Sequence, residues 1–113
     1  MTAMSVQTTI DEDTCFGLLT GATFGRVSLN VRAMPRIVPV RYAVHRGRIN
    51  AHLQCDEQLG DALDGAVVAL QADGFDDRTQ QVWSVHIVGR VLARCGADFV
   101  IDPTVVEGAW LDL

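Results

Sequence analysis

The sequence predicts a mainly β protein with short helices, folded as a barrel. Residues 26–32 alternate strictly between apolar and polar side chains, as strands with one buried face do, and residues 36–45 and 48–54 show the alternation again. The segments with helical spacing are short and stand outside this run of strands. Many short strands with helices pushed to the ends indicate a barrel and argue against a parallel βαβ sheet.

A short helix is expected ahead of the first strand. Thr9 and Glu12 have the spacing of a capping box, in which two side chains bond to the free backbone N–H groups at a helix start. Gly21 follows as a stop signal. The apolar residues near helical spacing in this segment are Ile10, Cys15, Leu18 and Leu19.

Two turns divide the alternating region into hairpins. Residues 33–35 turn the chain after the first strand, and Arg46-Gly47 closes the second hairpin. Pro39 falls inside the middle strand and lacks a backbone N–H, which indicates a strand edge or a bulge. The residues expected to face inward on the three strands are Val27, Leu29, Val31, Val38, Val40, Tyr42, Val44, Ile49, Ala51 and Leu53.

The middle of the chain adds a second helix and a further strand. A small helix is expected to start at Asp56, to turn Leu59 inward and to end at Gly65. Residues 66–73 then have the composition of a buried strand, and residues 74–81 that of an exposed loop.

The last part of the chain is predicted to be β structure as well. Residues 82–95 form a long strand or a bent pair of strands, with Gly89 as the bend. Residues 99–101 form a short strand, Pro103 centres a turn, and a final short strand ends the chain. The residues expected on the inner face of the long strand are Trp83, Val85, Ile87, Val91 and Ala93.

Length and composition favour a small oligomeric protein. The 113 residues provide one domain, residues 1–113, and an apolar fraction of 49% is more than a lone barrel of this size can easily bury. No apolar run approaches the roughly 20 residues of a membrane span, and the polar, acidic N-terminal segment is unlike a signal peptide. The expected compartment is the cytoplasm. Cys15, Cys55 and Cys95 fit no zinc motif or disulfide framework and are expected to be reduced thiols.

The charge is distributed unevenly along the chain. The net charge is −5, yet all nine basic residues are Arg, and six of them fall between Asp13 and Asp56, where there is no acidic residue. This arginine strip could receive a phosphate-bearing ligand, because guanidinium donors match phosphate oxygens, or it could simply solvate the outer face of the strands. Nucleic acid is disfavoured, since a pI near 4.9 means that the rest of the surface repels a polyanion. The six residues are Arg26, Arg32, Arg36, Arg41, Arg46 and Arg48.

Other kinds of chemistry find little support. His45, His52 and His86 come from different predicted strands, with no carboxylate or cysteine at ligand spacing, so no metal site is expected. Ser28 and Ser84 lie in alternating strands and lack the glycine-flanked turn that exposes the nucleophile of a hydrolase.

Several motifs in order carry a resemblance to a known family. Residues 25–28 read Gly-Arg-Val-Ser, Pro35 precedes the run Val-Pro-Val-Arg-Tyr at 38–42, and residues 83–85 read Trp-Ser-Val, with Gly89 shortly after. This order resembles the pyridoxamine 5'-phosphate oxidase-like flavin-binding split barrels, including their deazaflavin-binding relatives. The resemblance implies a split β-barrel of about six antiparallel strands in a Greek-key arrangement, with an N-terminal helix and one small inserted helix.

The same resemblance implies a homodimer that holds a flavin phosphate between its subunits, with FMN or the deazaflavin F420 as cofactor. Arg41 stands where the family often has Asn, and is expected to be the principal cation of the site. Leu53 and Gln58 stand where the family usually has Thr and Lys, so those two phosphate contacts are missing. The residues that the resemblance assigns to the cofactor are Val40, Arg41, His52, Leu53, Gln54, Gln58, Trp83 and Ser84.

Two functions therefore stay open at the level of the sequence. One is a small flavin-binding oxidoreductase, in which the protein positions the ring and the cofactor transfers hydride or electrons. The other is a flavin-free split barrel that kept the dimer, lost the phosphate site and works as a binding or scaffold protein.

Overall fold

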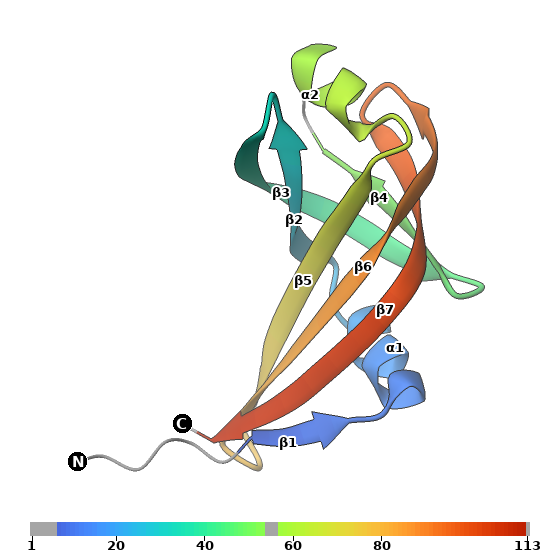
Figure 1. Cartoon of the computed structure of the whole chain (residues 1–113). Coiled ribbons are helices and arrows are strands. Elements are labelled where there is room, and N and C mark those ends of the chain that lie inside the picture. The colour runs from blue at the N-terminus through green and yellow to red at the C-terminus, as the bar shows by residue number, and fades with distance from the viewer. Residues whose placement is uncertain (1–6, 54–56, 113) are drawn as a thin grey trace.

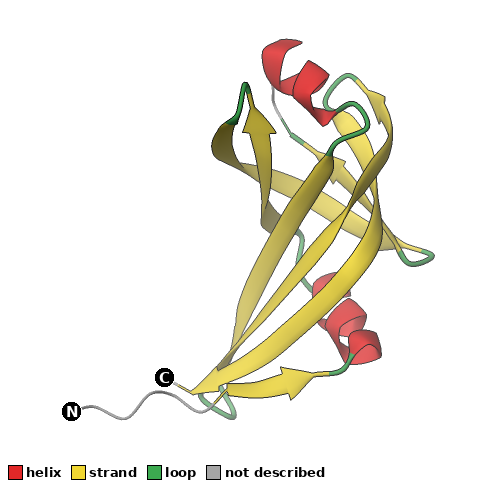
Figure 2. Cartoon of the chain, in the orientation of Figure 1, coloured by secondary structure: helices red, strands yellow, loops and turns green. Residues whose placement is uncertain are grey.

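The structure is a computed structural model that describes residues 7–53 and 57–112. Within these residues it contains seven strands and two short helices (Figures 1 and 2). In chain order the elements are β1 (Gln7–Ile10), α1 (Glu12–Thr20), β2 (Phe24–Val31), β3 (Met34–His45), β4 (Arg48–His52), α2 (Glu57–Leu63), β5 (Val67–Asp76), β6 (Gln81–Cys95) and β7 (Asp98–Asp112).

The strands form one antiparallel sheet that closes on itself. Their order is β1-β7-β4-β3-β2-β5-β6, and β7 also pairs with β6, so β7, β4, β3, β2, β5 and β6 form a ring. Strand β7 is shared, because its first residues pair with β4, its last residues pair with β1, and β6 runs beside it throughout. The long β5, β6 and β7 strands extend past the ring, where β1 and α1 lie (Figure 1). The predicted mainly β split barrel is confirmed.

Helix α1 is present, but its start differs from the prediction. The N-cap is Asp11, whose side chain accepts a hydrogen bond of 2.8 Å from the backbone N–H of Thr14. This bond to the carboxylate holds the pKa of Asp11 below its usual value. Thr9 instead lies in β1, a four-residue strand that pairs with β7 and was not predicted. Gly21 ends the helix as expected.

The two predicted hairpins form, with one shift in a turn. The first turn lies at Arg32 and Ala33, which both have positive φ, so Met34 and Pro35 already belong to β3 and the predicted turn over 33–35 is displaced. The second turn lies at residues 46–47, as predicted. Strand β3 pairs with β4 only from residue 41 onward, so Pro39 has a partner strand on one side alone, which is β2. Pro39 therefore lies at a strand edge, as predicted.

The C-terminal half is more regular than predicted. Strand β5 continues to Asp76, which pairs with Gln81, so half of the predicted loop over residues 74–81 is strand and the turn is confined to residues 77–80. Strand β7 is likewise unbroken at Pro103, where a turn was predicted, because Pro103 lies opposite Gly89 at a shift in register. The irregularity predicted at Gly89 therefore affects both β6 and β7.

A second shift in register lies between Val91 and Ala93. It leaves Ala93 exposed, whereas an inward position was predicted. The other predicted inward residues of this strand are buried.

The core fills the ring and extends beneath α1. Tyr42 is 5% exposed, and its hydroxyl donates a hydrogen bond of 2.8 Å to the backbone carbonyl of Leu19, which ties β3 to α1. Among the described residues no polar or charged side chain other than this tyrosine is buried. Neither described helix is long and apolar enough to cross a membrane. The most deeply buried side chains include Leu19, Val27, Val40, Ile49, Leu63, Leu70, Val85, Ile87, Phe99 and Ile101.

Helix α2 is fastened to the β6–β7 hairpin by Arg94. The Arg94 Nε lies 2.7 Å from Asp64 Oδ1, and Nη2 lies 3.1 Å from Oδ2, so the pair is bidentate. These hydrogen bonds hold the pKa of Asp64 below its ordinary value. Because Asp64 directly follows α2, the helix is held over one end of the barrel (Figure 1).

Tyr42→Phe tests the bond between β3 and α1. The substitution removes the hydroxyl's hydrogen bond to the Leu19 carbonyl, which still accepts from the backbone N–H of Ala22 at 3.2 Å, so we expect the free energy of unfolding at neutral pH to fall by about 0.5–1.5 kcal/mol. Burial raises the pKa of Tyr42 to about 12 from its ordinary value of 10.0, so ionisation favours the unfolded chain. The contribution of Tyr42 to the free energy of unfolding is therefore expected to be fully present below pH 10 and to be lost as the pH rises towards 12.

Urea denaturation at several pH values measures both effects, and Tyr42 is the protein's one tyrosine, so phenolate absorbance reports its titration alone. Between pH 10 and pH 12 the Tyr42→Phe variant should lose less unfolding free energy than the wild type, because it has no tyrosine to ionise. An identical pH dependence in both proteins above pH 10 would contradict this account.

Gly89→Ala tests the close approach of β6 to β7. An added Cβ would overlap the backbone carbonyl oxygen of Asp102, so one strand must move and we expect a loss of about 1–3 kcal/mol of stability. Gly17→Ala in α1 is the matched control, because nothing lies within 4 Å of its added Cβ and alanine favours a helix. Thermal denaturation should show a lower Tm for the first variant and an equal or higher Tm for the second.

Candidate functional site

Strand register brings a cation, an imidazole and a carboxylate together on the outer face of the barrel. Arg41 of β3 lies directly opposite His52 of β4, and His52 lies directly opposite Asp98 of β7. The His52 Nδ1 and the Asp98 Oδ1 are 2.7 Å apart. These residues line an open hollow of about 340 Å³, together with Tyr42, Ala43 and Asn50. We call it the Arg41 hollow.

The polar groups of this hollow leave donors available. Arg41 is exposed, and among the described residues its side chain has no hydrogen bond or ion pair, so its guanidinium can donate to an incoming anion. Asp98 accepts from Nδ1 of His52, which orients the ring and leaves Nε2 as the free ring nitrogen. The arrangement can therefore hold an anionic group by Arg41, and the free Nε2 of His52 accepts a hydrogen bond in the neutral ring and donates one when the ring carries both protons.

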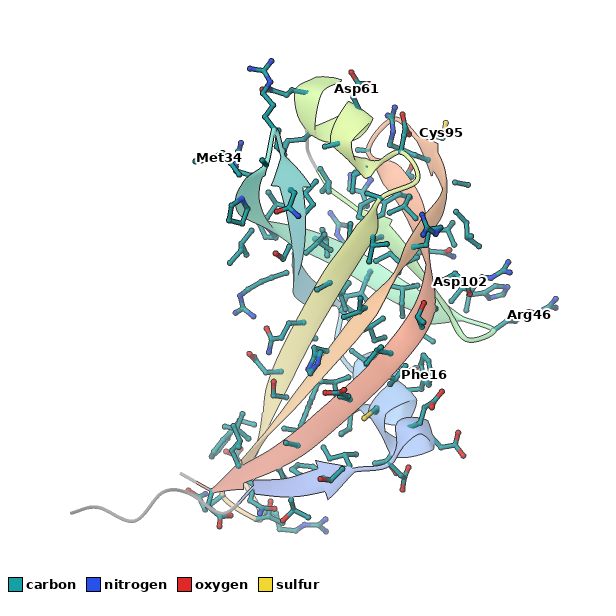
Figure 3. The ribbon with its side chains drawn as sticks, viewed as in Figure 1. Phe16, Met34, Arg46, Asp61, Cys95 and Asp102 are labelled. Atoms are coloured by element: carbon teal, nitrogen blue, oxygen red, sulfur yellow. The ribbon has the colours of Figure 1, made fainter. Side chains whose placement is uncertain are left out.

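Two other arginines of the strip lie beside carboxylates, and a third lies at a hairpin tip. Arg26 donates to Gln71 Oε1 at 2.7 Å and lies 3.5 Å from Asp73, while Arg48 lies 3.7 Å from Asp102. Arg46 instead extends from the tip of the β3–β4 hairpin, away from the body of the barrel (Figure 3). The strip is thus partly neutralised by carboxylates from β5 and β7.

The two positions that replace the family's Thr and Lys offer nothing to a phosphate. Leu53 is only 2% exposed, and its side chain belongs to the core. Gln58 is exposed on α2, but with its amide oxygen towards Arg32 it accepts bonds of 2.9 Å from both Nε and Nη2 of that residue. Gln54, the third residue assigned to this region, lies outside the described residues, as does the helix start at Asp56.

The remaining assigned residues lie apart from the Arg41 hollow. Val40 and Trp83 are buried, and the Trp83 indole packs so closely over Gly74 that a Cβ there would overlap it. Ser84 faces outward on β6, where its hydroxyl accepts a bond of 3.1 Å from Gln71 Nε2. Of the assigned residues that the structure describes, only Arg41 and His52 therefore line the same hollow.

Sequence reasoning missed Asp98 and Asn50, which line the Arg41 hollow beside Arg41 and His52. Asp98 is 46 residues from His52 and reaches it only because β7 pairs with β4. The alternation around Asn50 predicted its outward position, but gave no sign that a hollow lies there. Among the described residues no group of three or more potential ligands could hold a metal ion.

Small and apolar side chains also form a row across the outer face. Cross-strand pairs connect Ile37 to Ser28, Ser28 to Ala69, Ala69 to Val88, and Val88 to Val105. We call these five residues the outer apolar row. The two ends of the row are exposed, Ile37 to 70% and Val105 to 37%.

The family model described as pyridoxamine 5'-phosphate oxidase matches residues 11–95 of this chain. No curated protein matches the sequence.

Solved structures share the fold over nearly the full length. The FAD binding protein from Mycobacterium smegmatis has a TM-score of 0.77 at 23% identity, and the match covers 93% of this chain and 98% of that one. A FAD-binding protein from Mesorhizobium loti has a TM-score of 0.80 at 18% identity, with 96% and 99% covered. A conserved protein of unknown function from Corynebacterium diphtheriae has a TM-score of 0.73 at 18% identity, with 93% and 98% covered.

Proposed function

The chain belongs to the pyridoxamine 5'-phosphate oxidase family, and on that premise we propose that it binds a flavin nucleotide as a homodimer and works as an oxidoreductase. FMN is the first candidate and the deazaflavin F420 the second. The observation that carries the proposal is the Arg41 hollow, where a guanidinium without a partner among the described residues lies beside a histidine oriented by Asp98. The FAD-binding proteins of the same fold support a flavin in general.

The residues of the hollow fit the anionic end of such a cofactor. Arg41 would donate two parallel hydrogen bonds to phosphate oxygens, and the imidazolium form of His52 would donate one more through Nε2. Asp98 would keep the imidazole in place during binding. A bound flavin supplies hydride or electron transfer, so the protein's own part is to bind and orient it. In this proposal Arg41 and His52 replace the contacts that the family's Thr and Lys make.

A flavin-free barrel is the second candidate, and one observation favours it. Leu53 is part of the core and Gln58 is bonded to Arg32, so both positions expected to hold the phosphate are occupied by other interactions. Such a protein would have kept the dimer, lost the phosphate site and would act as a binding or scaffold module.

The homodimer is proposed to form through the outer apolar row. A two-fold interface brings the same patch of both subunits together, and a row of small and apolar side chains is compatible with such self-contact. The apolar fraction of 49% supports an arrangement in which part of the sheet's outer face is covered.

Arg41→Ala tests the proposed flavin site. A charge-assisted hydrogen bond to a phosphate contributes on the order of 1.5–3 kcal/mol, so we expect the dissociation constant for FMN to rise at least tenfold. Fluorescence quenching on titration with FMN, and separately with F420, measures the change. The visible spectrum of protein purified without added cofactor should already be yellow.

Arg46→Ala is the matched control, because it removes the same charge from a residue at the hairpin tip. Its FMN affinity and stability should equal those of the wild type. Equal weakening by both substitutions would mean that the arginines act as a diffuse field, and a wild-type protein that binds neither cofactor would favour the flavin-free barrel.

Ala69→Glu tests the dimer interface. Ala69 is the middle residue of the outer apolar row, and a two-fold axis would place two carboxylates close together in a desolvated contact, so the dimer should dissociate. Phe75→Glu is the control on the same strand and the same face, away from the row. Sedimentation velocity should find monomer for the first variant and dimer for the second; a dimer in both would exclude this row as the interface.

A further inference from the structure

A second hollow continues the Arg41 hollow across β4. It has a volume of about 330 Å³ and reaches β7 and the end of β6, where Val100, Ala93 and Cys95 line it. Asn50 and Asp98 line both hollows, so the two adjoin on one face of the sheet. We call the second one the Val100 hollow. Cys95 marks its far end, at the β6–β7 turn in Figure 3.

Asn50 is the polar side chain at the junction of the two hollows. It lies on the outer face of β4, directly opposite Ala43 of β3 and Val100 of β7. Within the part of the chain that the structure describes, its amide has no hydrogen bond, although it offers both a donor and an acceptor. Its cross-strand neighbours carry no polar side-chain atoms that could compete for those groups.

We propose that Asn50 binds the edge of a planar heterocycle that lies across β4, with the ligand's anionic group held by Arg41. The ring belongs to the class that carries neighbouring carbonyl and N–H groups, because a single carboxamide can accept from one and donate to the other. The apolar surface of Val100 and Ala93 would cover the rest of the ring. This inference rests on the proposed function, since the anionic end fixes where the ring begins.

The competing direction for the ring is towards β2. Phe24 lies directly opposite Arg41 on that side and is 65% exposed, so a ring could stack on it. Phe24 does not line the Arg41 hollow, whereas Asn50 does. The hollow therefore favours β4 as the ring's place, with Asn50 as the residue that determines ring specificity.

Asn50→Leu tests the inference, because leucine has a similar size and removes both the donor and the acceptor. Titrations use FMN, riboflavin, which has the ring without the phosphate, and inorganic phosphate, which lacks the ring. We expect binding of FMN and riboflavin to weaken at least tenfold, because two hydrogen bonds to the ring are lost, and binding of phosphate to stay unchanged. Asn30→Leu on the outer face of β2 is the matched control and should leave all three affinities unchanged.

Three outcomes would overturn the inference while the proposed function stands. The first is Asn50→Leu leaving FMN and riboflavin binding intact while Arg41→Ala weakens FMN. The second is Phe24→Leu weakening riboflavin more than Asn50→Leu does. The third is a change of sedimentation coefficient in Asn50→Leu, which would make Asn50 a subunit contact. A wild-type protein that binds phosphate but no flavin would instead refute the proposed function, and the ring site with it.

Discussion

The fold depends on the double pairing of β7. This strand must match β6 along its whole length while its first residues meet β4 and its last residues meet β1. A single uniform register cannot satisfy these partners around a closed ring of this size, and the two register shifts at Gly89 and Ala93 supply the necessary bends. The candidate site is a consequence of this closure, because Asp98 reaches His52 only where β7 meets β4.

Local rules predicted the part of the site that lies within one hairpin. A two-residue turn at 46–47 pairs His45 with Arg48, and the same register necessarily sets Arg41 opposite His52. The alternation of apolar residues fixed which of these side chains faces outward. Asp98 is a different case, because its place depends on a long-range pairing and on the bulge that precedes it, and neither leaves a periodic signal in the sequence.

Two of the incorrect predictions share one physical cause, which is that Gly and Pro serve packing here as well as turning. The sequence predicts that a loop starts at Gly74, yet Gly74 stays in β5, where the Trp83 indole occupies the space in which a Cβ would lie. The sequence also predicts a turn at Pro103, yet Pro103 stays in β7 opposite Gly89, where the irregular ladder tolerates the missing donor. Tertiary contacts in both places outweigh the local tendency to turn.

The order of strands around the ring also bears on how the chain reaches its native state. The β2–β3, β3–β4, β5–β6 and β6–β7 pairs join neighbours in the chain, so these hairpins have little loop entropy to overcome. Only the β2–β5, β4–β7 and β1–β7 pairs connect distant segments among the described residues. We expect two meanders to form early and the β4–β7 seam to close late, which pulsed hydrogen exchange can follow through the amides of β4. A chain stalled before that step would carry Arg41 beside His52 while the imidazole still rotated freely, so the proposed anion-binding surface would be complete only after the final closure.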